Sequence, residues 1–101
     1  MWKIERPVPK LLSDNEVGAR LARLKGWKRE GQFITKSLEF ETFMDAIGFL
    51  NRVANVAEVQ EHHPDIHVSY TEVTLSIQTH SEGGLTAWDF DLANAIDGIA
   101  T

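Results

Sequence analysis

The sequence predicts an α+β fold, in which helices pack on one face of a four-stranded antiparallel sheet in the order α-β-β-α-β-β-α. Four segments alternate apolar and polar side chains with a period of two, as strands covered on one side do. Three other segments repeat apolar side chains every three or four residues, as amphipathic helices do. They follow one another without a linker or an internal repeat, so we expect a single domain over residues 1–101.

The first predicted helix follows an extended segment, residues 6–10, in which two prolines disfavour helical backbone. Ser13 is the expected N-cap, and Glu16, three residues later, completes a capping box. The apolar stripe of this helix consists of Val17, Leu21 and Leu24. We expect the helix to end at Gly26.

Two pairs of strands are predicted on either side of a long helix. Residues 27–30 and 32–40 form the first hairpin, with Gly31 in its turn. The second pair comprises residues 66–70 and 73–80, in which apolar and polar side chains alternate. We expect each of these two later strands to have one covered, apolar face and one polar face.

The long helix runs from Thr42 to about Gln60, and Pro64 should end it by His62 or His63. Its apolar face contains Phe43, Ile47, Leu50, Ala54 and Ala57, widened by Met44, Phe49, Val53 and Val56. A face this broad should be buried against the sheet and against a second subunit.

The last predicted helix follows a turn at Gly83 and Gly84, with Thr86 as its N-cap. Its apolar stripe consists of Leu85, Trp88, Leu92, Ala95, Ile96 and Ile99. Asp89 stands at the third helical position, where an acidic side chain closes the cap and interacts favourably with the helix dipole.

Composition excludes several classes of site and partner. The chain has no cysteine, which removes disulfides, thiolate nucleophiles and cysteine-bound metals. The net charge of −5 argues against direct binding to nucleic acid, because an acidic surface repels phosphates. The first six residues contain no long apolar stretch, and no run approaches the roughly 18 apolar residues that span a bilayer. We therefore expect a cytoplasmic protein that does not bind membranes.

All four histidines lie between residues 62 and 80. His62 and His63 end the long helix and His80 ends a strand, so they can meet at one edge of a two-layer fold. Glu58 lies four residues before His62 and would share a helix face with it if the helix includes both. Such a carboxylate could orient an imidazole and fix its tautomer, or it could be an ordinary surface pair.

A metal site and a serine nucleophile are the rival interpretations of these residues. Adjacent histidines point apart on a helix or strand, and His-Glu-x-x-His is missing, so we predict no metal. The serines near the histidines are Ser69, Ser76 and Ser81. None lies in a Gly-x-Ser-x-Gly turn, and Gly83-Gly84 lacks the spacing of a phosphate-binding loop.

A longer pattern combines these residues. It reads Glu58-x-x-x-His62-His63-Pro64-Asp65, then Tyr70, then Thr79-His80-x-x-x-Gly84-Leu85-Thr86-x-x-Asp89, then Phe90-Asp91-Leu92-Ala93. This pattern covers about a third of the chain and resembles the signature of the pterin-4a-carbinolamine dehydratases. Ile66 and His67 stand where some members have an aromatic pair, and in this the chain looks more like bacterial members.

The resemblance implies dehydration of 4a-hydroxytetrahydrobiopterin to quinonoid dihydropterin, in support of tetrahydrobiopterin recycling. It also implies a homo-oligomer, either a dimer or a tetramer, that needs no cofactor. The catalytic residues implied are His62, His63 and His80. The substrate-binding residues expected beside them are Glu58, Pro64, His67, Thr79, Ser81 and Asp89.

Dehydration requires a proton donor for the leaving hydroxyl and a base for a ring nitrogen. Histidine changes its charge near neutral pH without special surroundings, so it suits both tasks. We expect His63 and His80 to be the acid and the base, and His62 to bind and orient the ring.

Two other roles stay open at this point. Relatives in animals serve as dimerisation cofactors of a homeodomain transcription factor, and the apolar helix at residues 43–59 could support such a non-catalytic interaction. A pterin-related role outside hydroxylation, such as molybdopterin metabolism, would use similar residues.

Overall fold

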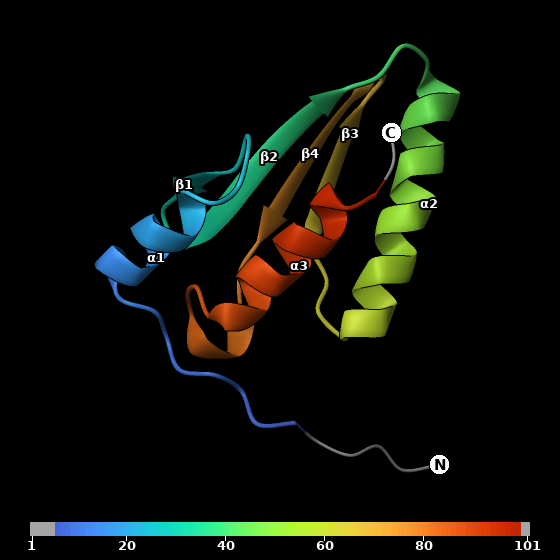
Figure 1. The fold of residues 1–101 in the computed structure, drawn as a ribbon. Coiled ribbons are helices and arrows are strands. Elements are labelled where there is room, and N and C mark those ends of the chain that lie inside the picture. The colour runs from blue at the N-terminus through green and yellow to red at the C-terminus, as the bar shows by residue number, and fades with distance from the viewer. Residues whose placement is uncertain (1–5, 100–101) are drawn as a thin grey trace, which may run out of the picture.

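A computed structural model describes residues 6–99. Its elements are α1 (Asp14–Leu21), β1 (Lys28–Glu30), β2 (Phe33–Glu39), α2 (Phe43–Gln60), β3 (Asp65–Ser69), β4 (Glu72–Ile77), the short 3-10 helix η1 (His80–Glu82) and α3 (Ala87–Asp97). The predicted order is confirmed, with η1 added between β4 and α3 (Figure 1). Residues 1–5 and 100–101 of the predicted domain lie outside the described residues.

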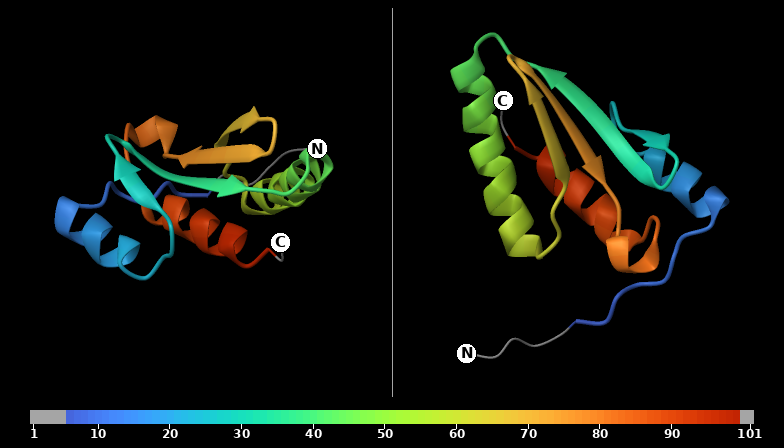
Figure 2. Two further views of the ribbon diagram at one scale, coloured as in Figure 1. Left: turned by 90° about the horizontal axis from the view of Figure 1, so that it is seen from above. Right: turned by 180° about the vertical axis from the view of Figure 1, so that it is seen from behind.

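The strands form one antiparallel sheet in the order β1-β2-β4-β3. The three α-helices lie on one face of it, and η1 lies on the other side (Figure 2, left). This arrangement confirms the predicted α+β class. None of the helices within residues 6–99 has the length and apolar character needed to cross a bilayer.

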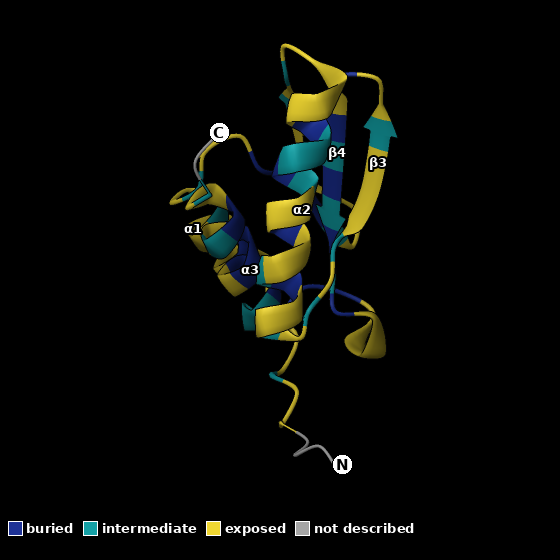
Figure 3. Cartoon of the chain, turned by 90° about the vertical axis from the view of Figure 1, so that its right-hand side faces the viewer, coloured by how far each residue is buried: buried dark blue, intermediate teal, exposed yellow. Residues whose placement is uncertain are grey.

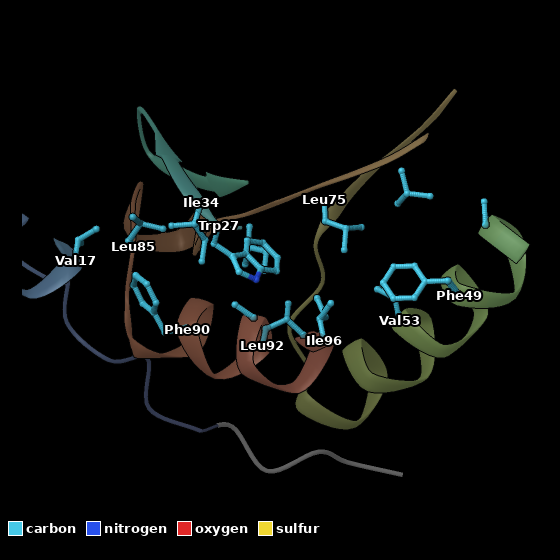
Figure 4. Close-up of a cluster of buried hydrophobic side chains, with 14 residues drawn as sticks. Val17, Trp27, Ile34, Phe49, Val53, Leu75, Leu85, Phe90, Leu92 and Ile96 are labelled. Carbon is cyan, nitrogen blue, oxygen red and sulfur yellow. The ribbon is translucent and has the colours of Figure 1, made fainter. Parts of the chain in front are cut away.

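The core lies between the sheet and the helices (Figure 4). The labelled residues are Val17, Trp27, Ile34, Phe49, Val53, Leu75, Leu85, Phe90, Leu92 and Ile96. Phe90, which the predicted stripe of the last helix omitted, is buried here. No buried side-chain nitrogen or oxygen in the described part of the chain lacks a hydrogen-bond partner. The polar side chains inside this core are therefore paired, as their burial requires.

Helix α1 begins as predicted and ends earlier than predicted. The capping box is present: Ser13 N donates to Glu16 Oε1 (2.9 Å), and Glu16 N donates to Ser13 Oγ (3.2 Å). The helix stops at Leu21 because the next amides, of Arg23 and Leu24, bond three residues back instead of four. Gly26 ends this tighter turn with a φ of +80°, so the glycine ends the turn and not the helix.

Helix α2 has the predicted bounds, but the predicted face is partly wrong. Asp45 N donates to the side chain of the N-cap Thr42 (3.0 Å). The buried residues are Ala46, Phe49, Val53 and Ala57. Phe43 and Ala54, which were expected in the buried face, are exposed, and the outward side of the helix is mostly exposed in Figure 3. The helix therefore turns Ala46 and Ala57 toward the core together with Phe49 and Val53, and it leaves Phe43 and Ala54 outside.

The later strands also differ in part from expectation. Val73, Leu75 and Ile77 of β4 are fully buried, as the alternation predicted. β3 is an edge strand that pairs with β4 only, and its apolar Ile66 is exposed instead of covered. β4 ends at Ile77 and not at residue 80, because the chain turns into η1 there.

Candidate active site

The centre of the site is a buried carboxylate at the start of α3. Asp89 is fully buried and accepts a hydrogen bond from Thr86 N at Oδ2 (2.7 Å). This bond and the Thr86 side chain close the predicted capping box. An acidic residue at this position is normally solvated, so its burial calls for further partners.

The further partners are His62 and Thr79. Thr79 Oγ1 donates to Asp89 Oδ2 (2.9 Å) and is also within hydrogen-bond distance of Thr86 Oγ1 (2.8 Å). His62 Nε2 lies 2.6 Å from Asp89 Oδ1. Because a carboxylate only accepts, His62 donates from Nε2, and its Nδ1 remains for another partner. The helix cap and the imidazole thus use different oxygens of one side chain.

The second pair joins His63 to Glu58. His63 Nε2 lies 2.5 Å from Glu58 Oε2, so here too Nε2 donates to a carboxylate. The sequence analysis expected Glu58 to share a helix face with His62 only if the helix included both residues, and that condition is not met. Helix α2 ends at Gln60, and Glu61 takes a left-handed conformation with a φ of +53°. The chain therefore changes direction before the histidines, and Glu58 meets the second of them.

His80 lies apart from these two pairs. It begins η1 and is exposed; its Nδ1 is 2.9 Å from Gln78 Nε2, and its ring meets Phe33 edge-on with centroids 6.5 Å apart. The amide nitrogen of Gln78 donates, so Nδ1 accepts and Nε2 carries the proton of the neutral ring. Within residues 6–99 no hydrogen bond joins His80 to His62 or His63. Its covalent neighbour Thr79 is the link to the network around Asp89.

The remaining predicted residues differ in burial and in position. Pro64 is half-buried next to His63, and Thr79 is buried, as are its side-chain partners Thr86 and Asp89. His67 is exposed on β3 and pairs with Thr74, on the sheet face away from the helices. Ser81 is exposed in η1, where its Oγ donates to Glu82 (3.2 Å). Among the described residues, neither His67 nor Ser81 is bonded to the network around Asp89.

A cleft of about 440 Å³ lies beside the second pair. It is lined by Arg6, Glu58, Glu61, His63 and Trp88. No sequence motif indicated a role in the site for Arg6, Glu61 or Trp88, nor for Phe33 and Gln78 beside His80. Trp88 was assigned to the apolar helix stripe, and its position next to Asp89 was the one signal that could have identified it.

Metal ligands are not grouped in the described part of the chain. No set of three or more His, Asp or Glu side chains there is arranged to hold an ion.

Comparison with known proteins gives the family. Residues 10–99 match the family model described as pterin 4 alpha carbinolamine dehydratase. The chain belongs to the pterin-4a-carbinolamine dehydratase family. The family resemblance predicted from residues 58–93 is thereby confirmed. The match extends over about nine-tenths of the chain, from before α1 to the end of α3.

Relatives of the dehydratase family support the same conclusion. A protein of Roseiflexus castenholzii is 49% identical over 88% of this chain and 96% of its own length. One from Mycobacteroides abscessus is 45% identical over 86% of this chain and 93% of its own length. Both are named, provisionally, as pterin-4-alpha-carbinolamine dehydratases, which are hydro-lyases.

Solved structures match the fold. A crystal structure from Brucella melitensis, described as a transcriptional coactivator/pterin dehydratase, is 34% identical with a TM-score of 0.86 and covers 91% of this chain and 100% of its own. A pterin dehydratase-like protein described as a RuBisCO assembly factor in the alpha-carboxysome has a TM-score of 0.58 at 19% identity, covering 70% of this chain and 82% of its own. The latter likeness concerns the fold alone.

Proposed function

We propose that this protein dehydrates 4a-hydroxytetrahydrobiopterin to quinonoid dihydropterin by histidine acid–base catalysis, and so supports tetrahydrobiopterin recycling. The observation that carries the proposal is the presence of two imidazole–carboxylate pairs on successive residues, His62 with Asp89 (2.6 Å) and His63 with Glu58 (2.5 Å). Membership of the dehydratase family supports the substrate class.

The reaction moves two protons and no net electrons. The bond between C4a and the hydroxyl oxygen breaks, and the oxygen leaves as water after receiving a proton from an acid. A base takes the proton of N5, whose electron pair forms the new C4a=N5 double bond. A well-placed acid or base typically contributes about 10²–10⁴-fold to such a step.

We assign the base to His63. Glu58 accepts from its Nε2, so Nδ1 is the basic nitrogen of the neutral ring. When Nδ1 takes the substrate proton, the carboxylate stabilises the imidazolium that forms. His63 is exposed, so it can release that proton to solvent after each turnover.

We assign the acid to His80 and the orienting role to His62. His80 is exposed, so it can take up a second proton from solvent before each turnover. In that imidazolium form Nδ1 donates to the Gln78 amide, which turns its oxygen toward the ring, and Nε2 gives its proton to the leaving hydroxyl, so the ring returns to its neutral form. His62 is held by a buried carboxylate, and a group fixed in this way suits binding of the ring.

Stopped-flow absorbance tests the proposal. A phenylalanine hydroxylase generates the 4a-hydroxytetrahydropterin, and its decay is followed with wild type, His63→Ala, Glu58→Gln and the control Glu30→Gln on exposed β1. We expect wild type and the control to accelerate the decay and His63→Ala to lose about 10²–10⁴-fold. If folded wild-type protein leaves the decay unchanged, the proposed function is wrong.

We propose further that the protein is a cytoplasmic homo-oligomer, a dimer or a tetramer. Apolar side chains outside the core support this: Met44 and Val59 project from α2, and Ile66 is exposed on the edge strand β3. Sedimentation equilibrium measures the mass. A monomer at micromolar concentration would contradict the oligomer.

A second candidate is a non-catalytic interaction through α2. An apolar hollow of about 310 Å³ between α2 and α3 is lined by Asn55, Val56, Val59, Gln60 and Ala95. The similar Brucella protein is described in part as a transcriptional coactivator, which favours this candidate. It replaces the first proposal if the oligomer is inactive in the stopped-flow assay and still exposes this hollow.

A further inference from the structure

One wall of the cleft beside His63 comes from a segment far from the histidine motif. The chain ahead of α1 runs below η1 and α3 toward the C-terminal end of α2 (Figure 1). Leu12 N donates to Leu85 O (2.8 Å), which attaches this segment to the loop before α3. The first described residue, Arg6, thereby reaches the cleft.

The guanidinium of Arg6 is held on two sides. Arg6 Nη2 donates to Gln60 O (2.5 Å) and to Glu61 O (2.8 Å), two carbonyls at the end of α2. These belong to the groups that a helix leaves without partners at its C-terminus. The guanidinium carbon lies 3.8 Å from the ring centroid of Trp88, a close cation–π distance.

The same tryptophan adjoins the catalytic centre. The ring of Trp88 meets that of His62 edge-on with centroids 5.9 Å apart, and its covalent neighbour Asp89 bonds His62. Arg6 and Trp88 therefore form a continuous wall that begins at His62 and borders the cleft containing Glu58 and His63.

The chemistry of this cleft matches one edge of a pterin. By definition a pterin has an amino group at C2 and an oxo group at C4, so its pyrimidine edge both donates and accepts hydrogen bonds. Glu58 and Glu61 bring carboxylates, which only accept, and Arg6 brings a guanidinium, which only donates. Both bonds to α2 use Nη2, and the guanidinium carries three further N–H groups on Nη1 and Nε.

We propose that Arg6 is a substrate-binding residue that donates a hydrogen bond to the 4-oxo group of the pterin, and that Trp88 holds its guanidinium in place for this. The inference rests on the proposed dehydratase function and assigns the part of the substrate that this wall recognises. The rival explanation is structural: Arg6 would only cap the C-terminus of α2.

A pair of ligands separates the two explanations. Calorimetry measures binding of 7,8-dihydrobiopterin, which has the 4-oxo group, and of a 2,4-diaminopteridine, which has an amino group at that position. The proteins are wild type, Arg6→Gln, Trp88→Leu and the control Arg20→Gln. Arg20 also lies over an aromatic ring, Phe90, at 5.9 Å, but it is on α1.

We expect Arg6→Gln to weaken binding of the 4-oxo ligand by about 10- to 100-fold, as loss of a charged hydrogen bond does. Binding of the 4-amino ligand should change by no more than about threefold. Trp88→Leu should act in the same direction, because it removes the support of the guanidinium. Arg20→Gln should change neither ligand. In the dehydration assay Arg6→Gln should raise KM more than it lowers kcat.

Equal weakening of both ligands by Arg6→Gln would show a structural cap and overturn the inference, as would unchanged binding of both. Wild-type turnover in the same preparation distinguishes the two possible failures. An inactive wild type refutes the dehydratase proposal and the role of Arg6 that depends on it. An active wild type whose Arg6→Gln variant keeps the preference for the 4-oxo ligand refutes the role of Arg6 alone.

Discussion

Replacing Asp89 with asparagine separates the two tasks of this buried carboxylate. Asp89 accepts from Thr86 N (2.7 Å), Thr79 Oγ1 (2.9 Å) and His62 Nε2 (2.6 Å). Asparagine keeps one oxygen, which can retain the first two bonds, and puts an NH₂ group in front of the imidazole. His62 must then accept at Nε2, so its proton moves to Nδ1 and the ring presents the wrong nitrogen.

The loss of stability follows from the bonds that change. Asp89→Asn keeps the cap and exchanges a charged hydrogen bond for a neutral one, which costs about 1–2 kcal/mol. Asp89→Ala removes the cap interaction, about 1 kcal/mol, and leaves the buried donors of Thr86 and His62 unpaired, for a total of about 3–5 kcal/mol. For a domain of this size each kcal/mol lowers Tm by about 4–8 °C.

Thermal unfolding followed by circular dichroism measures the loss of stability. Stopped-flow dehydration, at a temperature below the unfolding transitions of wild type and variant, measures the effect of the changed tautomer on turnover. We expect Asp89→Asn to lower Tm by about 4–16 °C and to reduce kcat by about 100-fold, because a His62 in the wrong tautomer no longer holds the pterin ring in line with the acid and the base. If Tm falls as expected and kcat stays at the wild-type value, the carboxylate is a helix cap only, and the reasoning about His62 is refuted.

Three further predictions concern stability. Thr79→Val removes a buried hydroxyl bonded to the central carboxylate and should cost about 1–3 kcal/mol in urea unfolding, whereas Thr79→Ser should cost less than about 1 kcal/mol. Asp97→Ala removes the acceptor shared by Trp27 Nε1 (2.9 Å) and Lys36 Nζ (3.0 Å). It should lower the free energy of unfolding by about 2–4 kcal/mol and leave kcat unchanged, and an unaltered Tm would contradict this. The backbone N–H of the N-cap residue lowers the pKa of Glu16, so its stabilising effect exists above the unfolded pKa and is lost as pH falls through the folded value. The Tm difference between wild type and Glu16→Gln should therefore shrink between about pH 6 and pH 3, and a constant difference would count against the capping box.

The types and order of the elements were predictable because their signals are local. Capping boxes lie within four residues, and the periods of two and 3.6 repeat within each element. The ends were less predictable. The alternation of β4 continues to His80 in the sequence, but Thr79 pairs with Gly84 across the following turn, and this contact draws the chain away from the sheet. No residue within the predicted strand favours a turn at that point.

The buried face of α2 was not predictable for a different reason. Apolar side chains surround most of this helix, so its periodicity fits several orientations. Packing density decides among them. The face that meets the core carries Ala46 and Ala57, which allow close approach, together with Phe49 and Val53. A periodicity argument treats Phe43 and Ala46 as equally apolar, although Phe43 is exposed and Ala46 is buried.

The motif contains the four residues of the two imidazole–carboxylate pairs, but it did not predict how they pair. Glu58 meets His63 because Glu61 is a non-glycine residue in the left-handed region, which local sequence rarely signals. Arg6 binds carbonyls 54 and 55 residues away in the chain, a contact that only the folded structure brings about. The left-handed Glu61 and the hydrogen bonds from Arg6 both belong to the turn after α2, which sets the direction of His62 and His63.

The difference in burial between the two adjacent histidines supports the proposed division of roles, in which His62 orients the substrate and His63 transfers protons. The side chain of His62 is 11% exposed and its partner Asp89 is fully buried, whereas the side chain of His63 is 59% exposed. A group that returns a proton to solvent in every turnover needs contact with water, which His63 has. A group that fixes the ring must itself be fixed, and His62 is held by a carboxylate that also begins a helix. Moving Asp89 would disturb that helix, so the stability of α3 keeps the orienting imidazole in place.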